Sequence, residues 1–140
     1  MSMASLEHFQ KMGSVMMKFR EDDFLCDTVL IADDKSLRAH SVLLAAASTA
    51  FRDAFSDNSN ASIPYNIGLP GFDSDTLEIA LQVIYTGELI LPMKYSSEDE
   101  LNKLFELLSF LGLDVKKWNG CQVIVTRYTK FLVVINVYFV

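Results

Sequence analysis

Residues 24–48, FLCDTVLIADDKSLRAHSVLLAAAS, are the stretch that decides the fold. The first part, residues 26–32, is rich in β-branched side chains, and an acidic turn at 33–35 separates it from a second short run at 36–39. Two such runs on either side of a tight polar turn predict a two-stranded β-hairpin.

Two short buried helices are predicted directly after this hairpin. Residues 42–47 are wholly apolar, which suits a helix inside a core. Ser48 and Thr49 can cap a second helix, which carries Phe51 and Phe55.

An amphipathic helix is predicted before the hairpin, over residues 5–20. Its apolar side chains recur at spacings of three and four and form one stripe: Leu6, Phe9, Met12, Met16 and Phe19. The stripe needs a cover, either the core of the same chain or another subunit, and methionine side chains adapt well to irregular apolar surfaces. Periodicity leaves both possibilities open.

The middle of the chain predicts a loop, an edge strand and a helix. Residues 56–62 are small and polar, which is typical of an exposed loop. Residues 63–69 suit a short strand at a sheet edge, because Pro64 cannot donate a hydrogen bond to a ladder. Asp75, with a glutamate three residues later, predicts the start of a helix that ends at Gly87.

One more strand and one more helix follow. Residues 88–91 are apolar enough for a strand that ends at a proline. Ser97 and Glu100 have the spacing of a capping box, and Gly112 is placed to end the helix that they begin.

The last part of the chain has a different character. Residues 122–126 and 131–140 are β-branched and aromatic, which is the composition of a buried or aggregating strand. They are either an extra strand or an alternative or truncated terminus, and the second interpretation is favoured. The expected organisation is therefore a disordered start at 1–4, one domain at 5–115 and an atypical hydrophobic tail at 116–140.

Composition narrows the class of protein. A chain of 140 residues with 51% hydrophobic residues fits one packed domain. The formal net charge is −6 and the basic residues are scattered, which disfavours direct nucleic-acid binding. Two cysteines are few for a secreted scaffold, and the apolar runs are too short to span a membrane. The expectation is an intracellular protein, with the nucleus favoured over the cytoplasm.

Residues with catalytic potential are sparse. His8 and His40 are the only histidines, and neither has a sequence-adjacent partner for acid–base work, so a structural role is favoured for His40. The paired aspartates lack the glycine of a calcium loop, and the glycines form no phosphate-binding pattern. We expect no enzyme, no metal and no cofactor.

Asp27 needs a partner, because a carboxylate within an apolar strand is costly unless it is hydrogen-bonded. The favoured interpretation is a hydrogen bond to backbone or to His40 that locks the hairpin onto the following helix. The alternative is a share in a binding groove.

Three blocks of the sequence resemble the signature blocks of the BTB/POZ domain. They are residues 24–30, residues 37–48 with Phe51, and residues 84–89, in that order. With their flanks they cover about residues 5–113. The resemblance implies an α+β fold in which a helical cluster is flanked by a small three-stranded sheet and preceded by a dimerisation helix. It assigns the stripe of residues 5–20 to a partner subunit, either a second copy or another BTB protein.

Within this family the resemblance implies a protein-interaction module of one of two classes. One is similar to the BTB zinc-finger transcription factors, whose dimers recruit co-repressors, and it is favoured. The other is similar to substrate adaptors of cullin-3 ubiquitin ligases, for which Phe55 and Asp57 are a near match to the contact motif. Ser41 stands where the first class often has a basic residue beside the aspartate pocket. A small ligand-binding domain is the alternative outside the family.

Overall fold

The computed structural model describes residues 2–57, 62–92, 95, 97–113 and 122–125. Within these residues it contains five helices and five strands. In chain order they are α1 (Met3–Glu21), β1 (Thr28–Ile31), β2 (Ser36–Ala39), α2 (Ser41–Ala47), α3 (Thr49–Asp57), β3 (Tyr65–Gly68), α4 (Ser74–Thr86), β4 (Glu88–Leu91), α5 (Glu98–Phe110) and β5 (Gln122–Val125).

The three-stranded sheet has the order β2-β1-β3. The predicted hairpin is present, with Thr28 opposite Ala39 in an antiparallel ladder. On its other edge β1 runs parallel to β3, with Thr28 beside Tyr65. A separate parallel pair joins β4 to β5. The predicted α+β architecture of a helical cluster flanked by a small sheet is confirmed.

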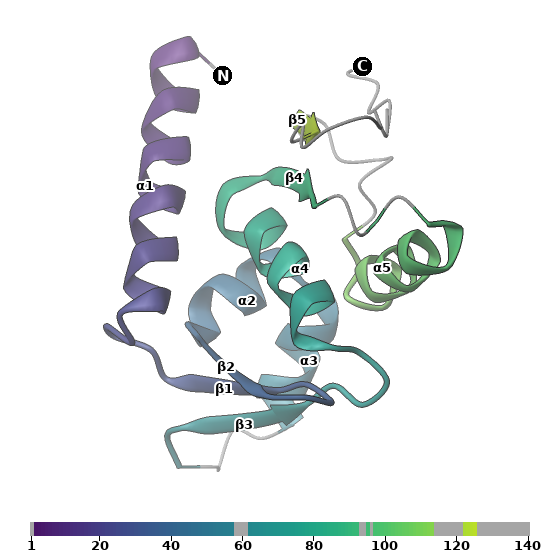
Figure 1. Ribbon diagram of the computed structural model, residues 1–140. Helices are drawn as coiled ribbons and strands as arrows, with labels where there is room; N and C mark the ends of the chain where they lie inside the picture. The colour runs from purple at the N-terminus through teal and green to yellow at the C-terminus, as the bar shows by residue number, and fades with distance from the viewer. Residues whose placement is uncertain (1, 58–61, 93–94, 96, 114–121, 126–140) are drawn as a thin grey trace.

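Helix α4 is the centre of the helical cluster and contacts α1, α2, α5 and β4. Leu77, Leu81 and Val83 are fully buried because α4 is apolar on almost every side, which is typical of a helix inside a core. In Figure 1, α1 stands at one side of this cluster and its N-terminal half extends beyond the other helices, while the sheet lies below.

Several helix boundaries confirm the predicted caps. The Ser48 hydroxyl accepts a hydrogen bond from the Phe51 amide at the start of α3, at 3.2 Å. Ser97 caps α5 by accepting from the Glu100 amide at 3.3 Å. Gly87 ends α4 in the left-handed region at φ 74°, where glycine is favoured.

Other boundaries differ from the predictions. Helix α1 begins at Met3, inside the segment predicted to be disordered, because the Ser2 hydroxyl accepts from the Ser5 amide and caps it. Helix α4 is capped by Asp73, whose carboxylate accepts from the Thr76 amide, and not by Asp75.

The predicted loop and tail also change. Helix α3 continues to Asp57, so the predicted loop begins later than residue 56, and residues 58–61 lie outside the described residues. β3 is shorter than the predicted strand of 63–69. Residues 122–125 form β5, which agrees with the extra-strand interpretation at that point, while residues 131–140 lie outside the description. No helix of the described part is long and apolar enough to cross a membrane.

Candidate interaction surface

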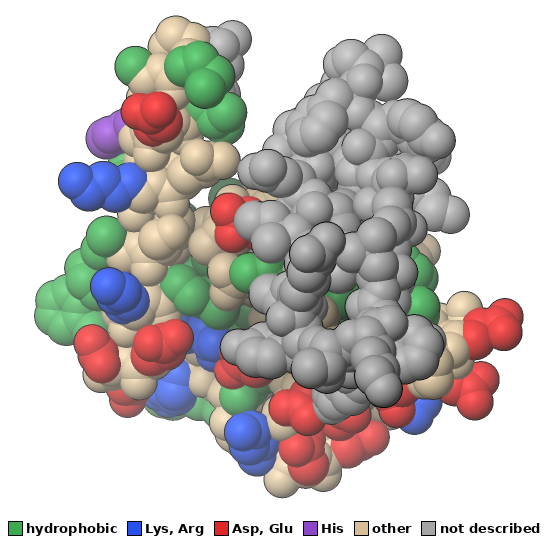
Figure 2. Space-filling model, turned by 45° about the horizontal axis from the view of Figure 1, so that its top comes forward, with side chains coloured by type: hydrophobic (Ala, Val, Ile, Leu, Met, Phe, Trp, Pro, Cys, Tyr) green, Lys and Arg blue, Asp and Glu red, His purple; other side chains and the backbone are tan. Residues whose placement is uncertain are grey.

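Helix α1 has an inner face against the body of the chain and an outer face that the chain leaves uncovered. On the inner face Gly13 and Arg20 are buried, and Met16 and Met17 pack partly against the core. The apolar side chains that the chain leaves uncovered, together called the outer face here, are between 40% and 58% exposed: Leu6, Phe9, Met12 and Val15. The helical repeat of about 3.6 residues puts Leu6 and Phe9 on the same side of α1 as Gly13, and they are uncovered because they belong to the projecting N-terminal half. Figure 2 shows hydrophobic side chains gathered at the projecting end of α1. Of the predicted stripe, Leu6, Phe9 and Met12 are exposed, whereas Met16 and Phe19 are half-buried. Met16 packs partly against the core.

A shallow cavity of about 370 Å³ runs along the same helix. Its lining residues all come from α1: His8, Lys11, Met12, Val15, Met16 and Phe19. The two basic side chains lie toward the N-terminal end of the helix, and the remainder is apolar. The cavity is therefore a groove along the outer face and not an enclosed chamber.

The turn after α1 extends the apolar surface. The ring of Phe24 meets the ring of Phe19 edge to face, with centroids 4.8 Å apart. Phe24 and Leu25 are 51% and 72% exposed, and Leu25 has φ 58°, a left-handed conformation that is strained for a leucine. The backbone thus holds two apolar side chains outward beside α1.

His40 and Tyr85 hold this turn in place from inside. The Phe24 carbonyl lies 2.9 Å from His40 Nε2, and because a carbonyl only accepts, Nε2 carries the proton. Nδ1 then accepts from the Tyr85 hydroxyl at 2.7 Å, and that hydroxyl accepts from the His40 amide at 3.0 Å. Burial raises the pKa of Tyr85 to about 12, so the hydroxyl keeps its proton. His40 is a structural link in this arrangement.

Asp27 is bound to the beginning of α2. Its carboxylate accepts from the Ser41 amide at 2.7 Å, from the Ser41 hydroxyl and from the Thr28 hydroxyl at 3.0 Å. Burial raises the pKa of the Asp27 carboxyl, but the hydrogen bonds from Ser41 and Thr28 outweigh burial and hold the pKa below its usual value. The partner is thus Ser41, and His40 is occupied by Phe24 and Tyr85.

Two ion pairs fix α1 and the hairpin. Arg20 is buried and pairs with Glu78 of α4, while a second guanidinium nitrogen reaches the Arg38 carbonyl at 3.4 Å. Arg38 in turn pairs with Asp23 at 2.7 Å on the surface. The buried guanidinium was not anticipated from the sequence, because its partner lies far along the chain.

Phe55 and Asp57, the predicted partner contacts, both lie on α3. Phe55 is half-buried, stacked on Phe51 at 6.4 Å and edge-on to Tyr65 at 5.4 Å between ring centroids. Asp57 is exposed at the end of the helix. Of these two predicted contacts, Asp57 is the exposed one.

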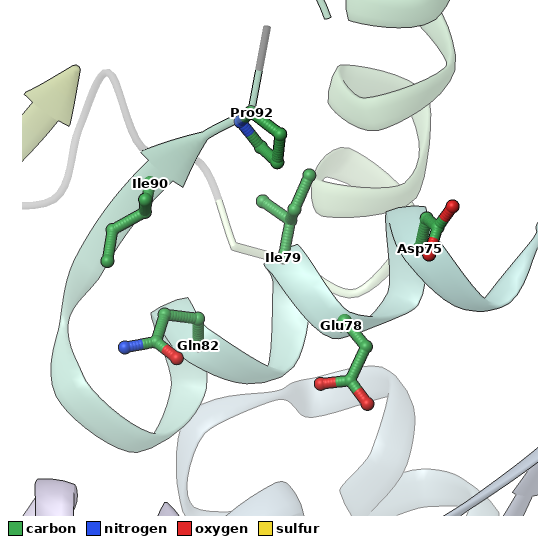
Figure 3. Close-up of a pocket in the computed structure, with 6 residues that line it drawn as sticks. All are labelled: Asp75, Glu78, Ile79, Gln82, Ile90 and Pro92. Atoms are coloured by element: carbon green, nitrogen blue, oxygen red, sulfur yellow. The ribbon is translucent and has the colours of Figure 1, made fainter. Parts of the chain in front are cut away.

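A second cavity, of about 430 Å³, lies between α4 and β4. Asp75, Glu78, Ile79 and Gln82 line it from successive turns of α4, and Ile90 and Pro92 line it from the other side (Figure 3). No nucleophile or histidine lines it among the described residues, and no cluster in that part of the chain has three or more potential metal ligands. Sequence reasoning did not locate this cavity.

The family model of the BTB/POZ domain matches residues 16–127, which include the C-terminal end of α1, the hairpin and helices α2 to α5. The chain belongs to the BTB/POZ domain family. It is therefore a protein-interaction module of the BTB type. The match runs past residue 115, where the sequence predicted the end of the domain, so the tail of 116–140 as a separate unit stays a prediction.

Curated relatives of this BTB domain include Kelch-like proteins. Kelch-like protein 2 of Homo sapiens is 31% identical over 111 residues, which are 79% of this chain and 18% of that protein. Kelch-like protein 3 of Bos taurus is 30% identical over 115 residues, 82% of this chain and 19% of that protein. The chain thus spans less than a fifth of the length of these relatives.

Solved BTB domains share the fold. The BTB domain of zebrafish PATZ1 superposes with a TM-score of 0.62 at 21% identity, covering 76% of this chain and 82% of that one. The BTB domain of human Gigaxonin gives the same TM-score at 26% identity, with coverages of 81% and 87%. These similarities confirm the predicted fold.

Proposed function

We propose that this BTB domain pairs with a second copy of itself through the outer face of α1. The observation that carries the proposal is the row of exposed apolar side chains on that face, continued by Phe24 and Leu25. Such a row is costly in water, and burial of apolar area contributes about 25 cal/mol per Å². A two-fold interface lets the same row cover itself, so one surface serves both subunits. The same face is available to a related BTB protein.

The solution mass over a dilution series tests this proposal. We expect light scattering to give a dimer for the natural chain and a shift toward monomer for Phe9→Lys, since the lysine would place a charge in the apolar contact. Phe110→Lys is the matched control, because Phe110 is 61% exposed on α5, compared with 58% for Phe9. A natural chain that stays monomeric at every concentration refutes the pairing.

The effector class is the finer part of the proposal. We propose the cullin-3 adaptor class ahead of co-repressor recruitment, because the curated relatives include Kelch-like proteins 2 and 3. In this class the segment after the Phe51 helix contacts the cullin, and Asp57 is exposed at the end of that helix, directly before the segment. Co-repressor recruitment, with a nuclear location, stays the second candidate.

Binding measured side by side separates the two classes. Calorimetry with the N-terminal region of cullin-3 should give saturable binding that Asp57→Lys weakens, while Asp53→Lys, a charge reversal earlier on the same helix, should leave it nearly unchanged. Binding of a co-repressor peptide without cullin-3 binding would reverse the order of the two classes. Absence of both would leave pairing as the whole activity of this chain.

A further inference from the structure

Gly13 is the point at which α1 meets the body of the domain. The residues before it on α1 are exposed or nearly so, and the side chains after it include the buried Arg20 and the half-buried Met16 and Met17. Gly13 itself is buried. It therefore separates the projecting half of the helix from the docked half, as the position of α1 in Figure 1 illustrates.

The contact at Gly13 is one of backbone against backbone. A Cβ atom at this position would lie 2.0 Å from the carbonyl oxygen of Tyr85, 3.1 Å from its carbonyl carbon and 3.3 Å from the Cα of Thr86. None of these atoms belongs to a flexible side chain, so none can swing aside. Any residue other than glycine would have to push α1 away from the end of α4.

Conformational freedom does not explain this glycine. Gly13 lies within α1 and is not among the glycines with positive φ, which are Gly71, Gly87 and Gly112. A glycine inside a helix lowers its intrinsic stability relative to alanine. The close approach to Tyr85 is therefore the physical reason for a glycine at this position.

We propose that Gly13 is a positioning residue for pairing, which seats α1 on the backbone of Tyr85 and Thr86 and so sets the direction in which the outer face is presented to the second copy. The inference rests on the proposed pairing function. Arg20, two turns along the helix, is the other anchor, held by Glu78 and by the Arg38 carbonyl. Lifting the helix at Gly13 while Arg20 stays bound tilts the projecting half.

A tilt of α1 has a large effect on the fit of two subunits in a two-fold interface. Both subunits carry the same displaced helix, so the misalignment of one apolar row relative to the other contains the error twice. The apolar side chains of the outer face would attract those of the second subunit by dispersion, and this attraction falls steeply over a fraction of an ångström. A small displacement at Gly13 is therefore sufficient to weaken pairing.

The substitution Gly13→Ala tests the inference because two physical effects oppose each other. Alanine should stabilise α1 by helix propensity, whereas the clash with Tyr85 should displace α1. We expect a lower melting temperature and a dimer dissociation constant raised by about tenfold or more. Ser14→Ala is the matched control, since Ser14 is exposed on the same helix, and it should leave the dissociation constant within about twofold. A Gly13→Ala variant with raised melting temperature and unchanged pairing overturns the inference.

Two further measurements keep the outcome decisive. If Gly13→Ala does not fold, Met17→Ala replaces it as the test variant, because it weakens the packing of α1 on the core without placing an atom against Tyr85. Unchanged pairing of Met17→Ala counts against a positioning role. If the natural chain is monomeric, the proposed pairing fails. Amide hydrogen exchange along residues 13–20 then tests only the packing of α1 on the backbone of Tyr85 and Thr86. If Gly13→Ala does not accelerate that exchange, the packing role of Gly13 is refuted as well.

Discussion

The carboxylate of Asp27 holds Ser41, the first residue of α2, through both its amide, at 2.7 Å, and its hydroxyl, at 2.5 Å. The same arrangement recurs beyond the other end of β1, where Asp34 accepts from the amide of Ser74 at 2.7 Å and from its hydroxyl at 2.6 Å. Each aspartate thus binds the first residue of a helix from the hairpin. The hairpin positions α2 and α4 through these two contacts.

Replacement of Asp27 by asparagine should destabilise the domain. The amide is a weaker acceptor for the Ser41 groups, and loss of a helix-capping carboxylate costs about 1 kcal/mol. Because the pKa of Asp27 is lowered in the folded state, its contribution is complete above the unfolded-state pKa of about 4 and is lost as pH falls further. Urea unfolding at pH 7 and pH 3 should show a difference between natural chain and variant that shrinks at acidic pH. Asp53→Asn, on the exposed side of α3, is the control.

Removal of the Tyr85 hydroxyl should lower the free energy of unfolding by more than the loss of one hydrogen bond would. Tyr85→Phe leaves both the His40 amide and Nδ1 without their partner in a buried place, and an unsatisfied buried group costs about 1–3 kcal/mol. Tyr65→Phe, which keeps the ring contact with Phe55, is the control for loss of a hydroxyl. Equal unfolding free energies for the two variants would contradict the bridging role.

The ionisation of Tyr85 adds a pH dependence at the alkaline end. Its pKa is raised to about 12, so the stabilisation is complete below the unfolded-state value of about 10 and is lost as pH rises toward 12. Absorbance titration of the tyrosines should therefore include a late step that belongs to Tyr85. In Tyr85→Phe this late step should be missing.

The Arg20–Glu78 pair should respond unequally to loss of either partner. Glu78→Gln leaves a buried guanidinium without its counter-charge, and Arg20 Nε already has no hydrogen-bond partner within the described part of the chain. We expect a loss of about 2 kcal/mol, below the range for fully buried pairs, because the Glu78 side chain is 38% exposed and screened by water. Adding Arg20→Met to this variant should recover part of the loss in urea unfolding. Asp23→Asn, which breaks the surface pair with Arg38, should cost less than about 1 kcal/mol.

The thiol of Cys26 should react slowly in the folded chain. Burial, followed by the nearby Asp23 carboxylate, raises the pKa of the Cys26 thiol, so little thiolate is present near neutral pH. Alkylation by iodoacetamide at pH 7.5, followed by mass spectrometry in a Cys121→Ser background, should be much slower in buffer than in urea. Equal rates in the two solutions would show that the thiol is open to solvent in the folded state.

The local signals of the sequence were reliable where one segment decides its own structure. The hairpin and the caps at Ser48 and Ser97 depend on residues a few positions apart, and they formed as predicted. The start of α4 was misplaced because Asp73 and Asp75 offer similar capping signals. Only the folded chain decides between them, since Asp34 holds Ser74 as the first residue of the helix.

Features that depend on distant segments could not be predicted. The sequence around Gly13 does not indicate that the Tyr85 carbonyl lies against it, and the sequence around Arg20 does not indicate that Glu78 is its ion-pair partner. Val15 and Leu25 were missed on the outer surface for a related reason, since exposure depends on how α1 is rotated against α4. Asp27 was recognised as needing a partner from its strand position, but its choice of Ser41 follows from where α2 begins.

The strand order constrains the route by which the chain folds. β1 and β2 are neighbours in sequence, whereas the parallel ladder joins Thr28 to Tyr65 across both α2 and α3. Closing that longer loop has an entropic cost that is recovered only once the two helices have docked. We therefore expect the hairpin to form before β3 joins the sheet. During synthesis on a ribosome, the edge of β1 that pairs with β3 should then stay open until the segment that carries β3 has left the exit tunnel.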